Sequence, residues 1–212
     1  MPDFDPHCQR CPRLAAHLAE VRRDFPAYHG RPVAPFGDAD PGLLIVGLAP
    51  GLHGANATGR PFTGDFAGIL LYKTLYEYGF SNRDSAVSRD DGLRLRHCRI
   101  TNAVKCLPPQ NKPTGREIAT CNAYLAGEIA ALRDGAVILA LGTIAHQAVL
   151  RALGLKQKDY PFGHGAEHAL PARRWLIDSY HCSRYNTQTG RLTEAMFREV
   201  FDTIRARLAG QA

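Results

Sequence analysis

Short apolar runs alternate along the chain with longer segments in which apolar residues recur at helical spacing. Each short run is bounded by glycine, proline or polar residues, which is typical of a strand buried on both faces of a sheet. These runs are residues 43–46, 98–104, 136–141 and 175–179. Because strands that alternate with helices form parallel sheets covered on both faces, the pattern predicts an α/β fold.

The longer segments carry apolar residues three and four positions apart, which predicts amphipathic helices. We expect helices over residues 14–24, 66–78, 114–132, 143–153 and 192–208. Thr114 and Glu117 form a capping-box pattern at the start of the third of these helices. Residues 26–42 contain several prolines and glycines, and residues 81–97 many charged residues, so both segments predict loops. Since no repeat or second domain is evident, we expect one domain over residues 1–212.

The composition is that of an ordinary globular protein, since 45% of the 212 residues are hydrophobic and 22% are charged. No apolar run approaches the roughly 18 residues of a membrane span. The first residues lack the basic start and the apolar core of a secretory signal. We therefore expect a cytoplasmic protein with no membrane partner. The net charge of +6 is compatible with a polyanionic partner such as nucleic acid.

A stretch rich in glycine and proline, residues 47–65, follows the first predicted strand. In open α/β sheets, ligands bind at the carboxyl ends of the strands. Glycines such as Gly47 and Gly51 let backbone N–H groups approach a phosphate or a flat ring, because no Cβ intervenes. The helix that begins at residue 66 points its N-terminus at the same crevice, which favours an anion. The stretch therefore predicts a ligand site; an ordinary turn between strand and helix is the alternative.

Polar residues also follow two other predicted strands. Asn102 lies near the end of the second strand, and its amide can both donate and accept, so it can read an amide-like edge; a turn or cap is the alternative. His181 follows the fourth strand and precedes a polar loop, residues 183–191. This arrangement suits a hydrogen-bond donor above a loop that grips phosphate, whereas a surface histidine is the alternative. Because three strand ends share one edge, we expect a single crevice.

Four of the six cysteines form two pairs. Cys8 and Cys11 make a CxxC motif, and Cys106 and Cys121 flank a proline-rich loop and the first turns of a helix. In a cytosolic chain, cysteines are more often metal ligands or buried thiols than disulfides. Four thiolates suit a structural zinc ion or a [4Fe–4S] cluster, and the spacing does not choose between them. Unpaired buried thiols remain a third interpretation.

Four motifs together resemble those of the family 5 (type-b) uracil-DNA glycosylases, and the resemblance covers essentially the whole chain. They are GLAPG at residues 47–51, TGRPFTGD at 58–65, TNAVKC at 101–106 and HCSRYNTQTGRL at 181–192. The resemblance implies a three-layer α/β/α fold on a four-stranded, mainly parallel central sheet. It also implies a [4Fe–4S] cluster, with Cys8, Cys11, Cys106 and Cys121 as its ligands.

The same resemblance implies an enzyme of DNA repair. It would flip uracil out of DNA, and also hypoxanthine or other deaminated bases, and hydrolyse the N-glycosidic bond to leave an abasic site. The expected partner is damaged DNA, and the expected state is a monomer. The predicted catalytic residues are Asp65, His181 and Asn102. The predicted base-binding residues are Gly47, Ala49, Phe62, Asn102 and His181. The predicted DNA contacts are Lys105, Ser183, Arg184, Asn186 and Arg191.

Carried over by position, Phe62 stacks on the flipped base, Asn102 reads its polar edge and His181 donates to its carbonyl oxygen. Leu48 stands where sister families place a polar residue that positions water, so Asp65 is the expected acid. Helix N-capping is the alternative role for Asp65.

Two residues depart from the family pattern: Ala57 stands where we expect Arg, and Cys182 where sister families have Pro. A competing hypothesis is a non-catalytic nucleic-acid-binding module whose cluster is structural or redox-sensing. Leu48 favours it, whereas the presence of Asn102, His181 and Asp65 together speaks against it.

Overall fold

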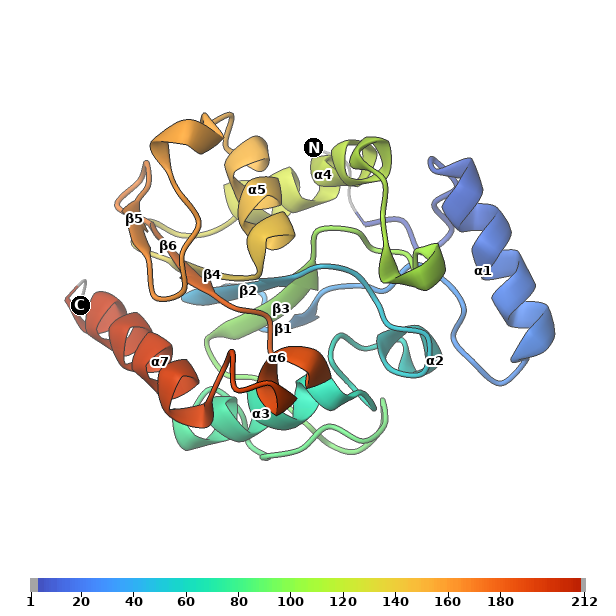
Figure 1. Ribbon diagram of the computed structural model, residues 1–212, viewed down its shortest axis with the longest axis horizontal. Helices are drawn as coiled ribbons and strands as arrows, with labels where there is room; N and C mark the ends of the chain where they lie inside the picture. Colours follow the sequence, from blue (N-terminus) through green and yellow to red (C-terminus); the bar gives the residue numbers. More distant parts are fainter. Residues whose placement is uncertain (1–3, 211–212) are drawn as a thin grey trace.

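The computed structural model describes residues 4–210, and within this range one mixed sheet of six strands lies between two layers of helices (Figure 1). The strand order is β1-β3-β2-β4-β6-β5. The strands are β1 (Phe36–Gly37), β2 (Leu43–Gly47), β3 (Cys98–Asn102), β4 (Val137–Leu141), β5 (Glu167–Ala169) and β6 (Trp175–Ser179). The four central strands run parallel to one another, whereas β1 and β5 pair antiparallel at the two edges.

The four central strands are the four apolar runs of the sequence, so the predicted α/β class is confirmed. The expectation of a four-stranded sheet is corrected, because two edge strands extend it. β1 has only two residues and lies in the proline-rich segment, and β5 alternates between exposed and half-buried residues. Neither edge strand is buried on both faces, so neither leaves an apolar run in the sequence.

Seven α-helices complete the part of the chain that the structure describes. They are α1 (Pro12–Asp24), α2 (Ala55–Thr58), α3 (Phe66–Glu77), α4 (Gly115–Ala130), α5 (Thr143–Ala152), α6 (Arg184–Gln188) and α7 (Glu194–Ala209). The five long helices are those that the periodicity predicts. The capping box of α4 is present: Thr114 Oγ1 accepts from the Glu117 N–H, and Glu117 Oε2 accepts from the Thr114 N–H. The short helices α2 and α6 lie in the loops that build the site.

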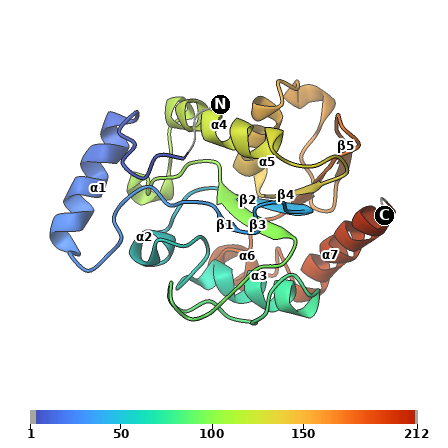
Figure 2. The ribbon, with the colours of Figure 1, turned by 180° about the vertical axis from the view of Figure 1, so that it is seen from behind.

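Alternate residues of β2 enter two different cores. Leu43 and Ile45 pack with residues of α3 and α7, whereas Leu44 and Val46 pack with residues of α4 and α5. Figures 1 and 2 show the two helical layers on opposite sides of the sheet from front and back. Because both faces of the strand are covered, every residue of β2 is apolar or glycine.

A third core joins α1 to the middle of the chain. Leu14, Leu18 and Val21 of α1 pack with residues of the segment that follows β3 and with Tyr124 of α4. At the start of α1, Arg13 forms a two-pronged ion pair with Glu117 of α4, with both N–O distances at 2.8 Å. Both views place α1 at the opposite end of the molecule from α7 (Figure 2).

No helix within residues 4–210 is long and apolar enough to cross a membrane. The cytoplasmic location expected from the sequence stays a prediction. The charged segment 81–97 forms a loop, as expected, with a single bridge between Ser81 and Leu95. Cys182, which departs from the family pattern, is fully buried in the core between the sheet, α3 and α7.

Candidate active site

A cleft of about 420 Å³ lies where the parallel strands β2, β3 and β6 end. This edge of an open α/β sheet is the usual place for a ligand. Its lining comprises Leu48, Ala49, Gly51, Ala55, Phe62, Asp65, Phe66, Ala67, Asn102, Asn111, His181, Ser183 and Arg184. The structure therefore brings together the predicted residues Ala49, Phe62, Asp65, Asn102 and His181, although they are widely separated in the sequence.

Phe62 forms one wall of the cleft and has an unusual backbone conformation. Its side chain is buried, and its φ of 53° lies in the left-handed region, which is costly for a bulky residue. Its ring lies nearly parallel to that of His181, with 5.9 Å between the ring centroids and 26° between the planes. Gly47 makes this packing possible, because a Cβ there would come within 2.8 Å of Phe62 Cζ and 2.5 Å of Asn102 Oδ1.

Arg60 holds the strained segment in place, which the sequence analysis did not foresee. Its guanidinium binds both carboxylate oxygens of Asp91, at 2.9 and 2.6 Å, and donates from Nε to Thr63 Oγ1 at 2.8 Å. Arg60 is almost fully buried, and it holds the pKa of Asp91 well below its usual range. Arg60 and Asp91 are 31 residues apart in the sequence and lie in irregular segments, so no periodic pattern reveals their ion pair.

Asn102 is the last residue of β3, and it offers a free acceptor. Its side chain is buried, and its Oδ1 has no hydrogen-bond partner among residues 4–210. A buried polar atom left unpaired costs about 1–3 kcal/mol, so native proteins seldom keep one without a reason. The geometry thus leaves Asn102 Oδ1 available to an N–H donor of a ligand in the cleft.

His181 is neutral near pH 7. Burial lowers the pKa of its imidazole to about 4, so the ring carries one N–H donor and one acceptor at that pH. Its backbone is fixed by Asn186 of α6, whose Nδ2 donates to His181 O at 2.8 Å. Asn186 is half-buried, and its predicted role as a DNA contact stays a prediction.

Asp65 is both an N-cap and a residue of the cleft. Its Oδ1 accepts from the backbone N–H of Gly68 at 2.9 Å, so the predicted alternative role as the cap of α3 is present. A Cβ on Gly54 would lie 2.6 Å from Oδ2, so the carboxylate packs tightly against the loop. Burial raises the pKa of Asp65, and the N–H groups of Gly68 and Ala67 counteract part of that rise.

Two of the predicted DNA contacts, Ser183 and Arg184, line the cleft. Ser183 is the N-cap of α6 and accepts from the Asn186 N–H at 3.4 Å. The exposed guanidinium of Arg184 lies over the Phe66 ring, 5.0 Å from its centroid. The exposed guanidinium of Arg191 lies over the Tyr180 ring at 4.7 Å. Arg184 therefore places positive charge at the cleft.

The prediction that Lys105 contacts DNA is wrong. Lys105 is 1% exposed, and its Nζ forms an ion pair with Glu128 Oε1 at 2.7 Å. Nζ also donates to Asn102 O at 3.0 Å and to Thr101 Oγ1. Its charge is satisfied inside the protein, because the chain turns inward after β3. Lys105 lies close to the TNAVKC motif in the sequence, but that closeness does not tell whether its side chain points outward or into the protein.

The four predicted metal ligands line one cavity. Cys8 and Cys11 precede α1, Cys106 follows β3 and Cys121 lies on α4, and all four are free thiols around the same space. The Lys105 N–H donates to Cys121 Sγ at 3.3 Å. Four thiolates around one space can hold a structural zinc ion or an iron–sulfur cluster. Which of the two they hold stays a prediction.

The fold and the cleft together define the class of protein: it is an α/β protein with a cleft that can bind a flat ring through its polar edge. Residues 34–205 match the sequence model of the Uracil DNA glycosylase superfamily. The chain is 48% identical over 208 residues to the Type-5 uracil-DNA glycosylase of Thermus thermophilus. The aligned region covers 96% of this chain and 94% of that protein. It is 45% identical to the Type-5 uracil-DNA glycosylase of Pyrobaculum aerophilum, over 92% of this chain and 86% of that protein. Identity to the Type-5 enzyme of Mycobacterium bovis is 44%, over 96% and 78%. The chain belongs to the uracil DNA glycosylase superfamily, as its motifs predict.

Proposed function

We propose that this protein is a monofunctional uracil-DNA glycosylase, which flips uracil out of DNA and hydrolyses its N-glycosidic bond to leave an abasic site. The observation that carries the proposal is the buried Oδ1 of Asn102, which has no hydrogen-bond partner in the described part of the chain and lies in the same cleft as Phe62 and the neutral His181. The relatives named Type-5 uracil-DNA glycosylases support it.

Three side chains of the cleft bind the flipped base. Phe62 stacks on the flipped ring, and base–aromatic stacking contributes about 1–3 kcal/mol. Asn102 Oδ1 accepts from the ring N–H of uracil. His181 donates its single N–H to a carbonyl oxygen of the base, where negative charge grows as the bond breaks. Because His181 is neutral, it donates this hydrogen bond without adding a positive charge to the cleft.

The bond change itself needs no protein nucleophile. The C–N bond breaks with its electron pair on the base, and the oxygen of water bonds to the sugar carbon, which has become cationic. The proton that this water loses neutralises the anionic base. Asp65 is the carboxylate of the cleft that can stabilise this positive charge or orient the water. Leu48 also lines the cleft, and its apolar side chain can do neither.

The substrate range extends to other deaminated bases such as hypoxanthine. Uracil and hypoxanthine share a ring N–H next to a carbonyl, which is the edge that an amide such as Asn102 can pair with. Exposed Arg184 and Arg191 bind the phosphates around the flipped nucleotide, and Ser183 lines the same side of the cleft. The protein acts on DNA as a monomer.

The cofactor is a [4Fe–4S] cluster held by Cys8, Cys11, Cys106 and Cys121. The single cavity that all four cysteines line supports this assignment. When bound, such a cluster ties the segment before α1 to the middle of the chain. The reaction above does not use its electrons.

Release of free uracil from a defined oligonucleotide under single-turnover conditions tests the proposal. Wild type should release uracil, and Asn102→Ala should lose on the order of 1–3 kcal/mol of transition-state stabilisation per lost partner. Asn122→Ala is the matched control, because Asn122 is also buried but hydrogen-bonds Ala148 O between α4 and α5. It should lower stability and leave the rate unchanged. Binding of DNA without any base release would favour the non-catalytic module instead.

A further inference from the structure

The Lys105 ammonium has two hydrogen-bond acceptors and a counter-ion, although almost none of the residue is exposed to solvent. An ammonium group has three donors. In Lys105 two of them donate to Thr101 Oγ1 and to Asn102 O, the latter at 3.0 Å, and the charge forms an ion pair with Glu128 Oε1 at 2.7 Å. A charge buried to this degree persists only when it is paired.

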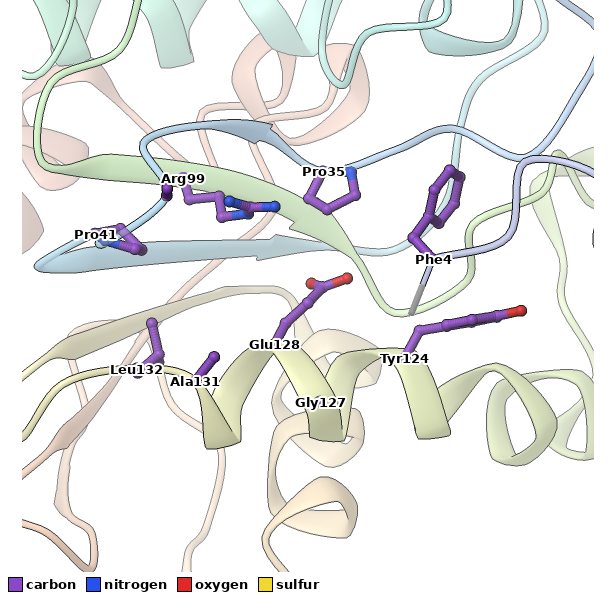
Figure 3. Close-up of a pocket in the computed structure, with 10 residues that line it drawn as sticks. Phe4, Pro35, Pro41, Arg99, Tyr124, Gly127, Glu128, Ala131 and Leu132 are labelled. Atoms are coloured by element: carbon purple, nitrogen blue, oxygen red, sulfur yellow. The ribbon is translucent and has the colours of Figure 1, made fainter. Parts of the chain in front are cut away.

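The two acceptors belong to the end of β3, and the counter-ion comes from a helix. Thr101 and Asn102 are the last residues of that strand, whereas Glu128 projects from α4. Figure 3 shows Glu128 rising from α4 towards the sheet, on one wall of a cavity of about 320 Å³. The ammonium therefore links the end of β3 to α4.

The side-chain amide of Asn102 has little else to orient it. Within residues 4–210, no hydrogen bond reaches its Oδ1, and the amide packs against Gly47. Its direction is therefore set by its backbone, which pairs with Gly47 at the last position of the β2–β3 register. The Asn102 carbonyl at this position is the one that Lys105 binds.

We propose that Lys105, with Glu128 as its counter-ion, is the positioning residue that fixes the base-reading amide of Asn102. The inference rests on the proposed function, since it concerns how accurately Asn102 meets the base. A displacement of about 1 Å at a reacting centre can lower a rate 10²-fold. Lys105 acts through Asn102 and does not touch the base.

The test removes the ion pair without leaving a buried charge. In Lys105→Met/Glu128→Leu both charges are replaced by apolar groups of similar size, a change that proteins often tolerate. Single-turnover uracil release should fall about 10- to 100-fold. Iron content and affinity for DNA with an abasic-site analogue should stay at the wild-type level. The matched control is Lys73→Met/Glu194→Leu, which removes an exposed ion pair between α3 and the start of α7 and should leave the rate unchanged.

A second comparison separates positioning from general loosening. In an Asn102→Ala background, the same double substitution should cause no further loss of rate, because the residue it positions is gone. An equal loss in both backgrounds, or no loss in wild type, overturns the inference. If wild type itself releases no uracil, the proposed function fails rather than this inference.

Thr101 provides a milder variant in case the double substitution prevents folding. Thr101→Val keeps the shape of the side chain and removes one acceptor from Lys105, so uracil release should fall severalfold. Thr101→Ser keeps the hydroxyl and should retain the wild-type rate. Equal rates in these two variants would likewise overturn the inference.

Discussion

At the scale of single residues, the cleft places two side chains in opposite electrostatic situations. Burial lowers the pKa of His181 to about 4, whereas burial raises the pKa of Asp65. In both cases the environment disfavours the charged form. For His181 this favours a neutral donor over a cation near pH 7. For Asp65, the helix N–H groups counteract part of the effect.

The pKa of His181 makes stability depend on pH. Its folded-state pKa of about 4 lies below the ordinary value of 6.5, so the unfolded chain binds a proton more readily. The folded state therefore loses stability as the pH falls from about 6.5 towards 4. When the pH is lowered from 7 to 4.5, we expect the melting temperature of His181→Asn to fall by less than that of wild type. Thermal unfolding at the two pH values measures this, with exposed His97→Asn as the control. Equal losses in wild type and His181→Asn would contradict the burial of a neutral ring.

Asp65→Asn separates the two roles of that residue. Asparagine is as good an N-cap as aspartate, so the melting temperature should change little. Removal of the negative charge should slow the chemical step, because the cationic sugar loses its nearest carboxylate. Single-turnover rates on uracil and hypoxanthine oligonucleotides measure this. Should both rates match wild type, Asp65 is a cap alone and catalysis rests on His181 and the backbone.

At the scale of elements, the sequence predicts the strands and helices that bury apolar residues in a regular pattern. It does not predict features that depend on a single contact between distant residues. The central strands and long helices follow from apolar periodicity. β1 and β5 pair through their backbones at exposed edges, so they leave no such pattern. The motifs identify Asn102 and His181, but the inward turn of Lys105 depends on Glu128, which approaches from another element. No local sequence pattern predicts this ion pair.

The loop of residues 81–97 supports the cleft through Asp91. The sequence assigned this loop no function, yet Asp91 binds the buried guanidinium of Arg60, two residues before the strained Phe62. We expect Asp91→Asn to lower the melting temperature, since one half of a largely buried pair remains uncompensated. It should also slow uracil release, because the wall of the cleft loosens. Asp90→Asn, at the exposed neighbouring position, is the control and should change neither quantity. An unchanged rate in Asp91→Asn would show that Phe62 is held without the loop.

At the scale of the whole molecule, the cysteine cavity connects distant parts of the chain. Cys8 and Cys11 lie before α1, and Cys106 and Cys121 lie in the middle of the sequence. With a [4Fe–4S] cluster bound, purified protein should be brown and contain iron in excess of zinc. Cys106→Ser should lose iron and colour and become less stable. Cys98→Ser changes a cysteine buried in a different core, so iron content should remain. A colourless, zinc-loaded and fully active wild type would contradict the assignment.

The packing of α1 also has a consequence for the order in which the chain becomes structured during synthesis. α1 leaves the ribosome early, but its apolar partners extend to Tyr124 of α4. At about 5–20 residues per second, the intervening stretch of roughly 100 residues takes about 5–20 s to be made. For that interval the core around Leu14, Leu18 and Val21 stays incomplete. Although α1 is made before the central strands, its packing is thus completed only after α4 has been made.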